Sequence, residues 1–599
     1  MLQRILYLLK TYLLTMLFFI IAKVTFMLYN SNQDYSSYDI TNVIWHGLSL
    51  DFSTSLYIII IPFLVCAISI WTGGLKVLRI LLSVYYVLVG TVMMLAFVAD
   101  TSLYEFWLFK LDSSCLQYLE TPTEAMASVS TGYIIIRVLT IIIGASIIWW
   151  AYTHPRWNIS TSHHRIIETI FALLCIPLII IGIRGGLGES TTNIGQVYYS
   201  QNQFLNHSAV NPVFNFIDSF DRAKADYHFM DDEECNQLIA SLYNTQSIGC
   251  DTLLNTQTPN IIIILLEGCG GEFTEIGGRT DITPNLNKLA KEGIYFTNCY
   301  GNSWRTDRGT VCALSGYPSF PTMSVMKIPS KSRSLPNIAR TLQQQRGYNT
   351  SYLYGGDINF TNMRSYLISG GFENLTWMKD YSAEEQETAQ WGVRDDITFK
   401  TLYQMTTKTK QPFLIGFSTL SSHTPWDVPI RHFDDEIINS FYYLDQCIGD
   451  FIQNLRKSDA WKNTLVIMLP DHGIPYNGIN ETSPLQNHIP MIWVGGAVKE
   501  PKRIEQVCNQ TDLPATLLGQ LGILHDEFTF SRDVLSSTYT WPFAVHTYDD
   551  GFSMVDSASF VCYDFVSNKV IAEEGQNSEQ LFTLGKAILQ AASKDFKER

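Results

Sequence analysis

Four short apolar segments in the second half of the chain each lead into an acidic or histidine side chain. The segments are 260–266, 351–354, 413–417 and 465–469, and the side chains that follow them are Glu267, Asp357, His423, Asp471 and His472. In open α/β sheets, ligands bind outside the carboxyl ends of the strands, so these side chains are expected at one rim. Taken singly, an aspartate after a strand usually caps a helix, and a lone histidine is usually structural. Their convergence from four strands predicts a functional site.

Glutamate, aspartate and histidine side chains together offer the oxygen and nitrogen ligands that suit a divalent cation such as Mn²⁺ or Zn²⁺. No CxxC or HExxH spacing elsewhere in the chain competes for that role. The sequence therefore predicts a metal site at this rim.

A nucleophile is expected in segment 302–310, where Thr306 lies at the start of a short helix that ends at Gly316. A helix N-terminus favours an incoming phosphate. A bound metal lowers the pKa of a hydroxyl and so favours an alkoxide nucleophile. Alternatively, Thr306 only caps the helix, and this interpretation would be preferred if the neighbouring ligands were absent.

The elements that position these side chains alternate between strands and helices after residue 258. Three helices are marked by capping residues and prolines at their starts and by glycines at their ends, over 283–293, 334–347 and 512–522. This order predicts a mainly parallel sheet covered by helices on both faces. We assign residues 259–540 to this catalytic domain and expect 541–599 to complete it with strands and a helix. Residues 186–258 are expected to form connector helices.

The first 185 residues have a different character. A membrane-spanning helix needs about 20 mostly apolar residues. Five stretches qualify, namely 12–29, 43–71, 78–98, 133–150 and 166–183. The fold class is therefore an N-terminal α-helical transmembrane bundle of about five spans, followed by an α/β domain.

Charges in the loops predict the orientation of this bundle. One side carries the basic residues Arg4, Lys10, Lys76, Arg79, Arg156 and Arg165. The other carries Asp34, Asp39, Asp100, Glu105, Asp112, Glu120 and Glu124, with Lys110 as the only base of the longer loop. Positively charged loops stay in the cytoplasm. We therefore expect a multi-pass protein of a bacterial-type cytoplasmic (inner) membrane, with an extracytoplasmic catalytic domain.

Three further features bear on partners and stability. The net charge of −15 and the lack of basic runs exclude nucleic acid as a partner. Asp51, inside the second apolar stretch, either contacts a lipid head group or another polar part of a substrate, or forms a buried polar contact between helices, or precedes a helix that starts later in the sequence. Cys235 and Cys250 lie outside the spans, where both a disulfide and free thiols are compatible with the sequence.

Six motifs together resemble the lipoteichoic acid synthase and phosphoglycerol transferase family, within the sulfatase-like alkaline phosphatase superfamily. In chain order they are Leu265-Leu266-Glu267-Gly268, Thr283-Pro284-Asn285-Leu286, Arg305-Thr306-Asp307, Ser315-Gly316-Tyr317-Pro318, Ser422-His423-Thr424-Pro425 and Asp471-His472-Gly473. They follow the five predicted spans in the family's order, so the resemblance covers nearly the whole chain.

The resemblance implies roles for individual residues. The metal ligands would be Glu267, Thr306, Asp471 and His472, with Thr306 also the nucleophile. The substrate head group would be held by Asp357, Arg364 and His423. His488 resembles a further active-site histidine of the related phosphoethanolamine transferases. Asn362 stands where lipoteichoic acid synthases typically carry tryptophan, which leaves the head group open.

The implied reaction moves a phospho-alcohol, phosphoglycerol or phosphoethanolamine, from a phospholipid donor to an envelope glycan or lipid acceptor. It would pass through a phospho-threonine and use Mn²⁺, with Zn²⁺ or Mg²⁺ as alternatives. His423 would hold the phosphate or protonate the leaving group. A metal-dependent phosphodiesterase and a sulfatase-like hydrolase remain alternatives, although residues 305–308 lack the Cys/Ser-x-Pro-x-Arg pattern of sulfatases. An inactive membrane sensor or scaffold is the alternative of another class.

Overall fold

The computed structural model of the chain describes residues 1–599 apart from 31–34, 108–109, 112, 114, 117–130, 155–160, 201, 222–225, 244, 246, 480–481, 550 and 566–567. The chain divides into two compact units, Met1–Arg222 and Ala223–Arg599. Some of the charged residues from which the membrane orientation was predicted lie outside the described residues. They are Asp34, Asp112, Glu120, Glu124, Arg156 and the side chain of Glu105.

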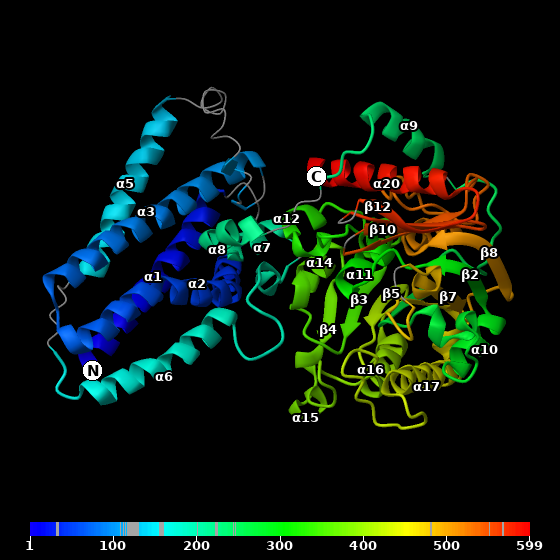
Figure 1. Ribbon diagram of the computed structural model, residues 1–599, viewed down its shortest axis with the longest axis horizontal. Helices are drawn as coiled ribbons and strands as arrows, with labels where there is room; N and C mark the ends of the chain where they lie inside the picture. The colour runs from blue at the N-terminus through cyan, green and yellow to red at the C-terminus, as the bar shows by residue number, and fades with distance from the viewer. Residues whose placement is uncertain are drawn as a thin grey trace. The chain divides into compact units, whose positions relative to one another are not determined.

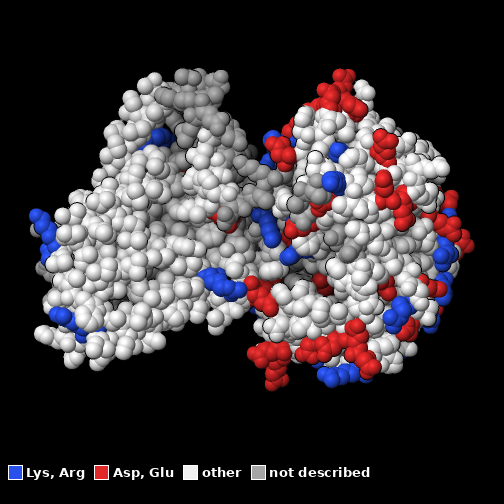
Figure 2. All heavy atoms as spheres, viewed as in Figure 1, with Lys and Arg blue, Asp and Glu red and all other residues white. Residues whose placement is uncertain are grey.

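Long apolar helices form most of the first unit (Figure 1): α1 (Leu2–Tyr29), α2 (Ser37–Thr72), α3 (Lys76–Trp107), α5 (Thr131–Thr153) and α6 (Arg165–Arg184). Within the described residues, these five helices are long and apolar enough to cross a membrane, which confirms the predicted bundle. Figure 2 shows few charged side chains over them. The helix α2 begins before its apolar run because Ser36 caps it, with the backbone N–H of Asp39 donating to Ser36 Oγ.

Asp51 lies inside α2 and forms a buried ion pair with Lys23 of α1. Asn211, which caps the short helix α8 (Pro212–Asp218), donates from Nδ2 to Asp51 Oδ1 at 2.8 Å. The preceding helix α7 (Gln203–Ala209) also contacts α2. These contacts agree with the interpretation of Asp51 as a buried polar contact between helices. Because α2 already begins at Ser37, Asp51 does not precede the helix.

Replacing Asp51 with alanine is expected to destabilise the bundle by about 3–5 kcal/mol, because Lys23 would keep a buried charge without its partner. The double variant Lys23→Met/Asp51→Leu removes both charges and should lose less stability than Asp51→Ala alone. Unfolding of the purified protein in detergent micelles measures both effects. A double variant that is less stable than Asp51→Ala would show that the pair itself is strongly stabilising.

The second unit is built on an eight-stranded sheet with the order β4-β3-β5-β1-β6-β7-β2-β8. Its strands are β1 (Asn260–Leu266), β2 (Ile294–Tyr300), β3 (Asn349–Tyr354), β4 (Asn374–Trp377), β5 (Phe413–Ser418), β6 (Thr464–Pro470), β7 (His488–Val494) and β8 (Lys502–Asn509). Only β7 runs antiparallel to its neighbours, β2 and β6. The mainly parallel sheet predicted from the sequence is confirmed, and β1, β3, β5 and β6 end at one edge.

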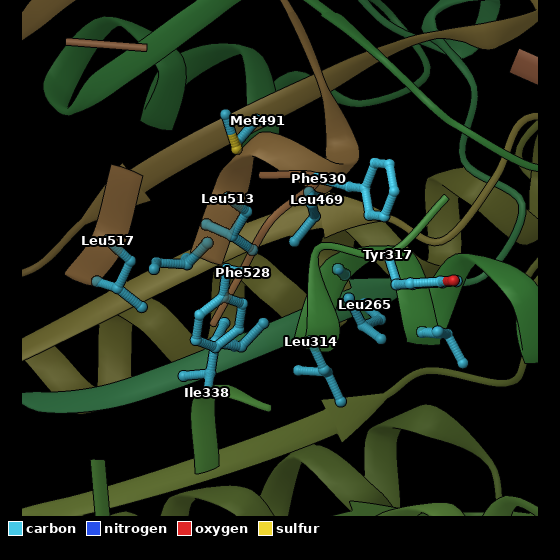
Figure 3. Close-up of a cluster of buried hydrophobic side chains, with 14 of the residues drawn as sticks. Leu265, Leu314, Tyr317, Ile338, Leu469, Met491, Leu513, Leu517, Phe528 and Phe530 are labelled. Carbon is cyan, nitrogen blue, oxygen red and sulfur yellow. The ribbon is translucent and has the colours of Figure 1, made fainter. Parts of the chain in front are cut away.

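Helices cover both faces of this sheet. Ile262 and Ile264 of β1 pack in one core with α10 (Pro284–Glu292), α16 (Asp395–Lys408) and α17 (Glu436–Arg456). The alternate residues Ile263 and Leu265 pack in the other core. Its helices include α11 (Thr306–Ser315), α13 (Ile338–Arg346) and α19 (Leu513–Gln520). Figure 3 shows part of that second core, with Leu265, Leu314, Ile338 and Leu517 among its labelled side chains. A strand buried on both faces explains the unbroken apolar run of β1.

One predicted helix start is wrong. The helix that ends before Gly347 begins at Ile338 rather than at Ser334, because Asn337 caps it by accepting the N–H of Ala339 at 2.9 Å. The residues before it belong to a separate short helix, α12 (Pro329–Ser332), and its following turn. Ser334 and Asn337 are both good N-cap residues and lie close together, so the sequence alone did not distinguish which of them caps the helix.

A second, antiparallel sheet follows, with the order β12-β11-β10-β9. Its strands are β9 (Phe543–Tyr548), β10 (Gly551–Asp556), β11 (Phe560–Asp564) and β12 (Lys569–Glu574), and α20 (Ser578–Glu598) packs on it. The remaining α-helices of this unit are α9 (Asp232–Leu242), α14 (Met363–Ser369), α15 (Ala383–Gln386) and α18 (Pro484–Asn487). All eleven cysteines are free, so Cys235 and Cys250 do not pair.

Candidate active site

Glu267, Asp471 and His472 meet at the carboxyl ends of two adjacent strands. Leu266 of β1 lies opposite Pro470 of β6, so Glu267 and Asp471 follow directly paired residues. One ligand atom from each of the three side chains lies within 4.8 Å of the others, and all three residues are buried. The sequence predicted these side chains at one rim of the sheet, and the strand register places them next to one another.

Backbone contacts hold Asp471 in place. Its Oδ1 accepts the N–H groups of Gly268 at 3.0 Å and of His472 at 2.9 Å. Its carbonyl oxygen accepts from Gln510 Nε2 at 2.9 Å. Helix α11 packs so closely against it that a Cβ at Gly309 would lie 2.0 Å from the same carbonyl oxygen. The close approach requires glycine at position 309.

Thr306 is the first residue of α11, and Arg305 takes the N-cap position. The Thr306 hydroxyl does not cap the helix but donates to Glu267 Oε2 at 2.9 Å. The alternative in which Thr306 only caps the helix therefore does not describe this side chain. Its oxygen lies next to the acidic cluster and at a helix N-terminus, where a negative charge is stabilised.

The electrostatics of the cluster fit a divalent cation. Burial opposes a charge on His472, but Asp471 and Glu267 outweigh that effect and raise the pKa of its imidazole to about 10. Burial and the nearby charge of Glu267 raise the pKa of Asp471. Two carboxylates and an imidazole crowded together out of water are the donor set that a divalent cation would neutralise, so the residues fit a metal.

Asp357 and Arg364 lie near each other beyond the end of β3. Asp357 Oδ1 accepts from the backbone N–H of Asn359 at 3.0 Å and from its side chain at 2.9 Å. Burial lowers the pKa of the Arg364 guanidinium, which the charge of Asp357 only partly offsets. Arg364 Nε is buried and has no hydrogen-bond partner within the described part of the chain. The guanidinium is therefore placed to receive an anion.

His423 follows β5, and its neighbour Ser422 ties the segment to the cluster by donating to the Glu267 carbonyl oxygen at 2.7 Å. The pKa of the Glu267 carboxyl is raised by burial and lowered by His472. A positive charge on the nearby His423 lowers it further, by a smaller amount. The indole ring of Trp391 lies against His423, with ring centroids 4.4 Å apart. No pattern in the sequence pointed to Trp391, because the contact joins two loops 32 residues apart.

Residues 259–523 match the family model described as Sulfatase. This part of the chain, less than half of its length, is similar to the sulfatase family. The match and the relatives below confirm the resemblance predicted from the sequence.

Two curated relatives that match this region carry names of activities. "Lipoteichoic acid synthase 2" of Bacillus subtilis (strain 168) is 26% identical over 314 residues, which cover 47% of this chain and 48% of that protein. "Phosphoglycerol transferase I" of Xanthomonas campestris pv. campestris (strain B100) is 23% identical over 309 residues, 46% of this chain and 43% of that protein. The chain thus spans about half the length of the curated relatives it matches.

Solved structures agree on the fold. A protein in the alkaline phosphatase superfamily from Vibrio parahaemolyticus superposes with a TM-score of 0.54 at 26% identity, covering 62% of this chain and 98% of that one. The lipoteichoic acid synthase LtaP from Listeria monocytogenes superposes with a TM-score of 0.50 at 19% identity, covering 61% and 98%. The second likeness concerns the fold alone.

Asn362 is buried in the second unit and has a left-handed backbone, with φ +64°, directly after Thr361 with φ +54°. Its Nδ2 donates to the carbonyl oxygen of Lys327 at 3.3 Å. Two consecutive left-handed residues other than glycine store strain, and they lie between Asp357 and Arg364. The turn therefore sets the spacing of those two side chains.

His488 is not part of the three-residue cluster. It begins β7, its Nε2 donates to the Thr297 carbonyl oxygen at 2.8 Å, and its ring stacks on Tyr300 with centroids 4.7 Å apart. Burial lowers the pKa of its imidazole. In this geometry His488 links β7 to β2, and its resemblance to an active-site histidine stays a prediction.

Glu272, five residues after Glu267, is a buried carboxyl that no sequence pattern singled out. Neither of its oxygens has a hydrogen-bond partner in the described chain. Burial raises the pKa of this carboxyl from 4.5 to about 8. The folded protein thus holds a proton here between pH 4.5 and pH 8, where the unfolded chain has lost it, and stability falls as the pH rises through that window.

Glu272→Gln removes this titration. The variant is expected to be more stable than the parent at pH 8.5 by roughly 3–5 kcal/mol, with the difference vanishing near pH 4.5. Urea unfolding of the two proteins at both pH values measures it. An equal difference at the two pH values would contradict a neutral buried carboxyl.

Proposed function

We propose that this chain is a membrane-anchored phosphotransferase that moves a phospho-alcohol head group, phosphoglycerol in the first place, from a phospholipid to an envelope acceptor. The observation that carries the proposal is the Thr306 hydroxyl bound to Glu267 beside Asp471 and His472, in a chain whose first unit has helices suited to span a membrane. The names of the relatives support phosphoglycerol ahead of phosphoethanolamine.

In the proposed reaction, different residues attack the phosphorus, bind the substrate and protonate the leaving group. Thr306 Oγ1 attacks the phosphorus of the phospholipid, releases diacylglycerol and forms a phospho-threonine ester that still carries the head-group alcohol. An acceptor hydroxyl then attacks this phosphorus and releases Thr306. Arg364, with Asp357 beside it, would hold the phosphate and the head group. His423 would hold the phosphate or protonate the leaving oxygen.

The metal site would use Glu267, Asp471 and His472, together with Thr306. We propose Mn²⁺ as the cation, with Zn²⁺ or Mg²⁺ as alternatives. When bound, such a cation lowers the pKa of a hydroxyl and stabilises the charge that develops on phosphoryl oxygens.

The proposed location is a bacterial-type cytoplasmic membrane, with the catalytic unit outside the cytoplasm beside its lipid donor. Cysteines introduced at Thr161 and at Ser200 are expected to react with an impermeant maleimide from opposite sides. Labelling of both from the same side would contradict the five-span orientation.

Transfer is tested with the full-length protein in vesicles of labelled phosphatidylglycerol or phosphatidylethanolamine, supplied with native envelope glycans and lipids. We expect diacylglycerol release and labelled phospho-alcohol on an acceptor. Release of free phospho-alcohol alone, with acceptors present, would instead indicate a phosphodiesterase. Absence of cleavage of either lipid by metal-loaded protein would favour a sensor or scaffold.

A further inference from the structure

Two hydrogen-bond donors converge on a single carbonyl oxygen beside the candidate site. His423 Nδ1 lies 2.9 Å from the Thr424 carbonyl oxygen, and Trp391 Nε1 donates to the same oxygen at 2.6 Å. The two rings are in contact, tilted by 56°. The indole therefore holds both the carbonyl and the imidazole that the carbonyl binds.

The shared carbonyl fixes the protonation pattern of His423. A carbonyl oxygen only accepts, so the contact places a proton on Nδ1. The other ring nitrogen, Nε2, forms no hydrogen bond with any described residue and is therefore free to contact a substrate oxygen. A histidine that exchanges protons at one nitrogen needs the other to be held in this way.

Trp391 is itself held by a tight turn. Ala389 and Gly392 exchange backbone hydrogen bonds of 2.9 and 3.1 Å. Gly392 has φ +136°, and a Cβ there would lie 2.3 Å from the Gly355 carbonyl oxygen, which also accepts from the backbone of Val393 at 2.9 Å. Gly355 directly follows β3, so the turn is fastened to the strand that leads into Asp357.

Phe360 completes the surroundings of the indole. Its ring meets Trp391 edge to face, with centroids 6.0 Å apart, and is 40% exposed. It lies in the strained turn before Asn362. The ring of Trp391 thus contacts both His423 and Phe360, which restricts its rotation.

We infer that Trp391 positions His423 so that Nε2 donates the proton to the leaving oxygen and later accepts it from the acceptor. The inference rests on the proposed function. In the first step the Thr306 oxygen–phosphorus bond forms, the bond from phosphorus to the diacylglycerol oxygen breaks, and that oxygen takes the proton from Nε2. In the second, the acceptor oxygen–phosphorus bond forms, the bond to Thr306 breaks, and the acceptor proton passes to Nε2. Solvent takes and returns the Thr306 hydroxyl proton.

The test compares two leaving groups, because p-nitrophenolate departs without a proton whereas the alkoxide of diacylglycerol requires one. Trp391→Phe keeps an aromatic ring but removes the N–H. In the full-length, metal-loaded protein we expect it to lower kcat on phosphatidylglycerol vesicles about tenfold with little change in KM. On bis(p-nitrophenyl) phosphate we expect a loss of less than about twofold. Trp541→Phe, in the segment before β9, serves as the matched control.

A double-mutant cycle adds a second readout. Once His423 is alanine, Trp391→Phe should have no further effect on lipid cleavage, since its action passes through that imidazole. Equal losses on both substrates, or an effect that persists without His423, would overturn the inference and make Trp391 merely structural. A parent protein that cleaves only the nitrophenyl ester would overturn the proposed function, and the inference with it.

Discussion

Thr306→Ala is expected to lower turnover of phospholipid on the order of 10³-fold or more while the protein stays folded. The hydroxyl is the group that would form the covalent intermediate, whereas the charge that attracts a cation comes from Glu267 and Asp471. Metal content should therefore change little. Steady-state rates, metal analysis and thermal unfolding of the same preparation measure the three quantities.

Helix α11 offers a matched control for this variant. Thr310 lies one turn after Thr306, is fully buried, and its hydroxyl has no hydrogen-bond partner among the described residues. Thr310→Ala should therefore leave turnover near the parent level. Thr306→Ser, which keeps a hydroxyl, should recover part of the activity. Substantial turnover in Thr306→Ala would mean that another group, or water, attacks phosphorus.

Glu267→Gln is the second variant with a large expected effect. It keeps the shape of the side chain but removes one of two carboxylates from the cluster and weakens the contact to the Thr306 hydroxyl. We expect the bound metal to fall well below one equivalent and turnover to drop on the order of 10³-fold. Excess Mn²⁺ should restore part of the activity, which a folding defect would prevent.

Glu272→Gln is the control for that experiment, since it changes the same residue type five positions later and outside the cluster. It should keep both metal and turnover. If Glu267→Gln kept a full equivalent of metal, Glu267 would not be a ligand. If both variants lost metal alike, the loss would reflect the fold of the loop after β1.

The relation between sequence and site differs from residue to residue. Glu267, Asp471 and His472 were predictable because each follows a strand whose apolar run is unbroken, and parallel strands end at one edge. Their pairing was not predictable, because the sheet order places β1 between β5 and β6, two strands that come much later in the sequence. The helix start at Asn337 was missed because neighbouring residues offered equally good caps.

The sequence by itself determined the membrane helices, the α/β pattern and the residue types of the candidate metal cluster, since these depend on local hydrophobicity and on short motifs. Only the tertiary structure decided the partner of Asp51, the strand contact of His488 and the indole that holds His423. Each of these contacts joins segments that are apart in the sequence, and the local propensity of either segment does not specify its partner. Such a contact depends on how elements pack, and packing direction is not encoded in the spacing of residues along the chain.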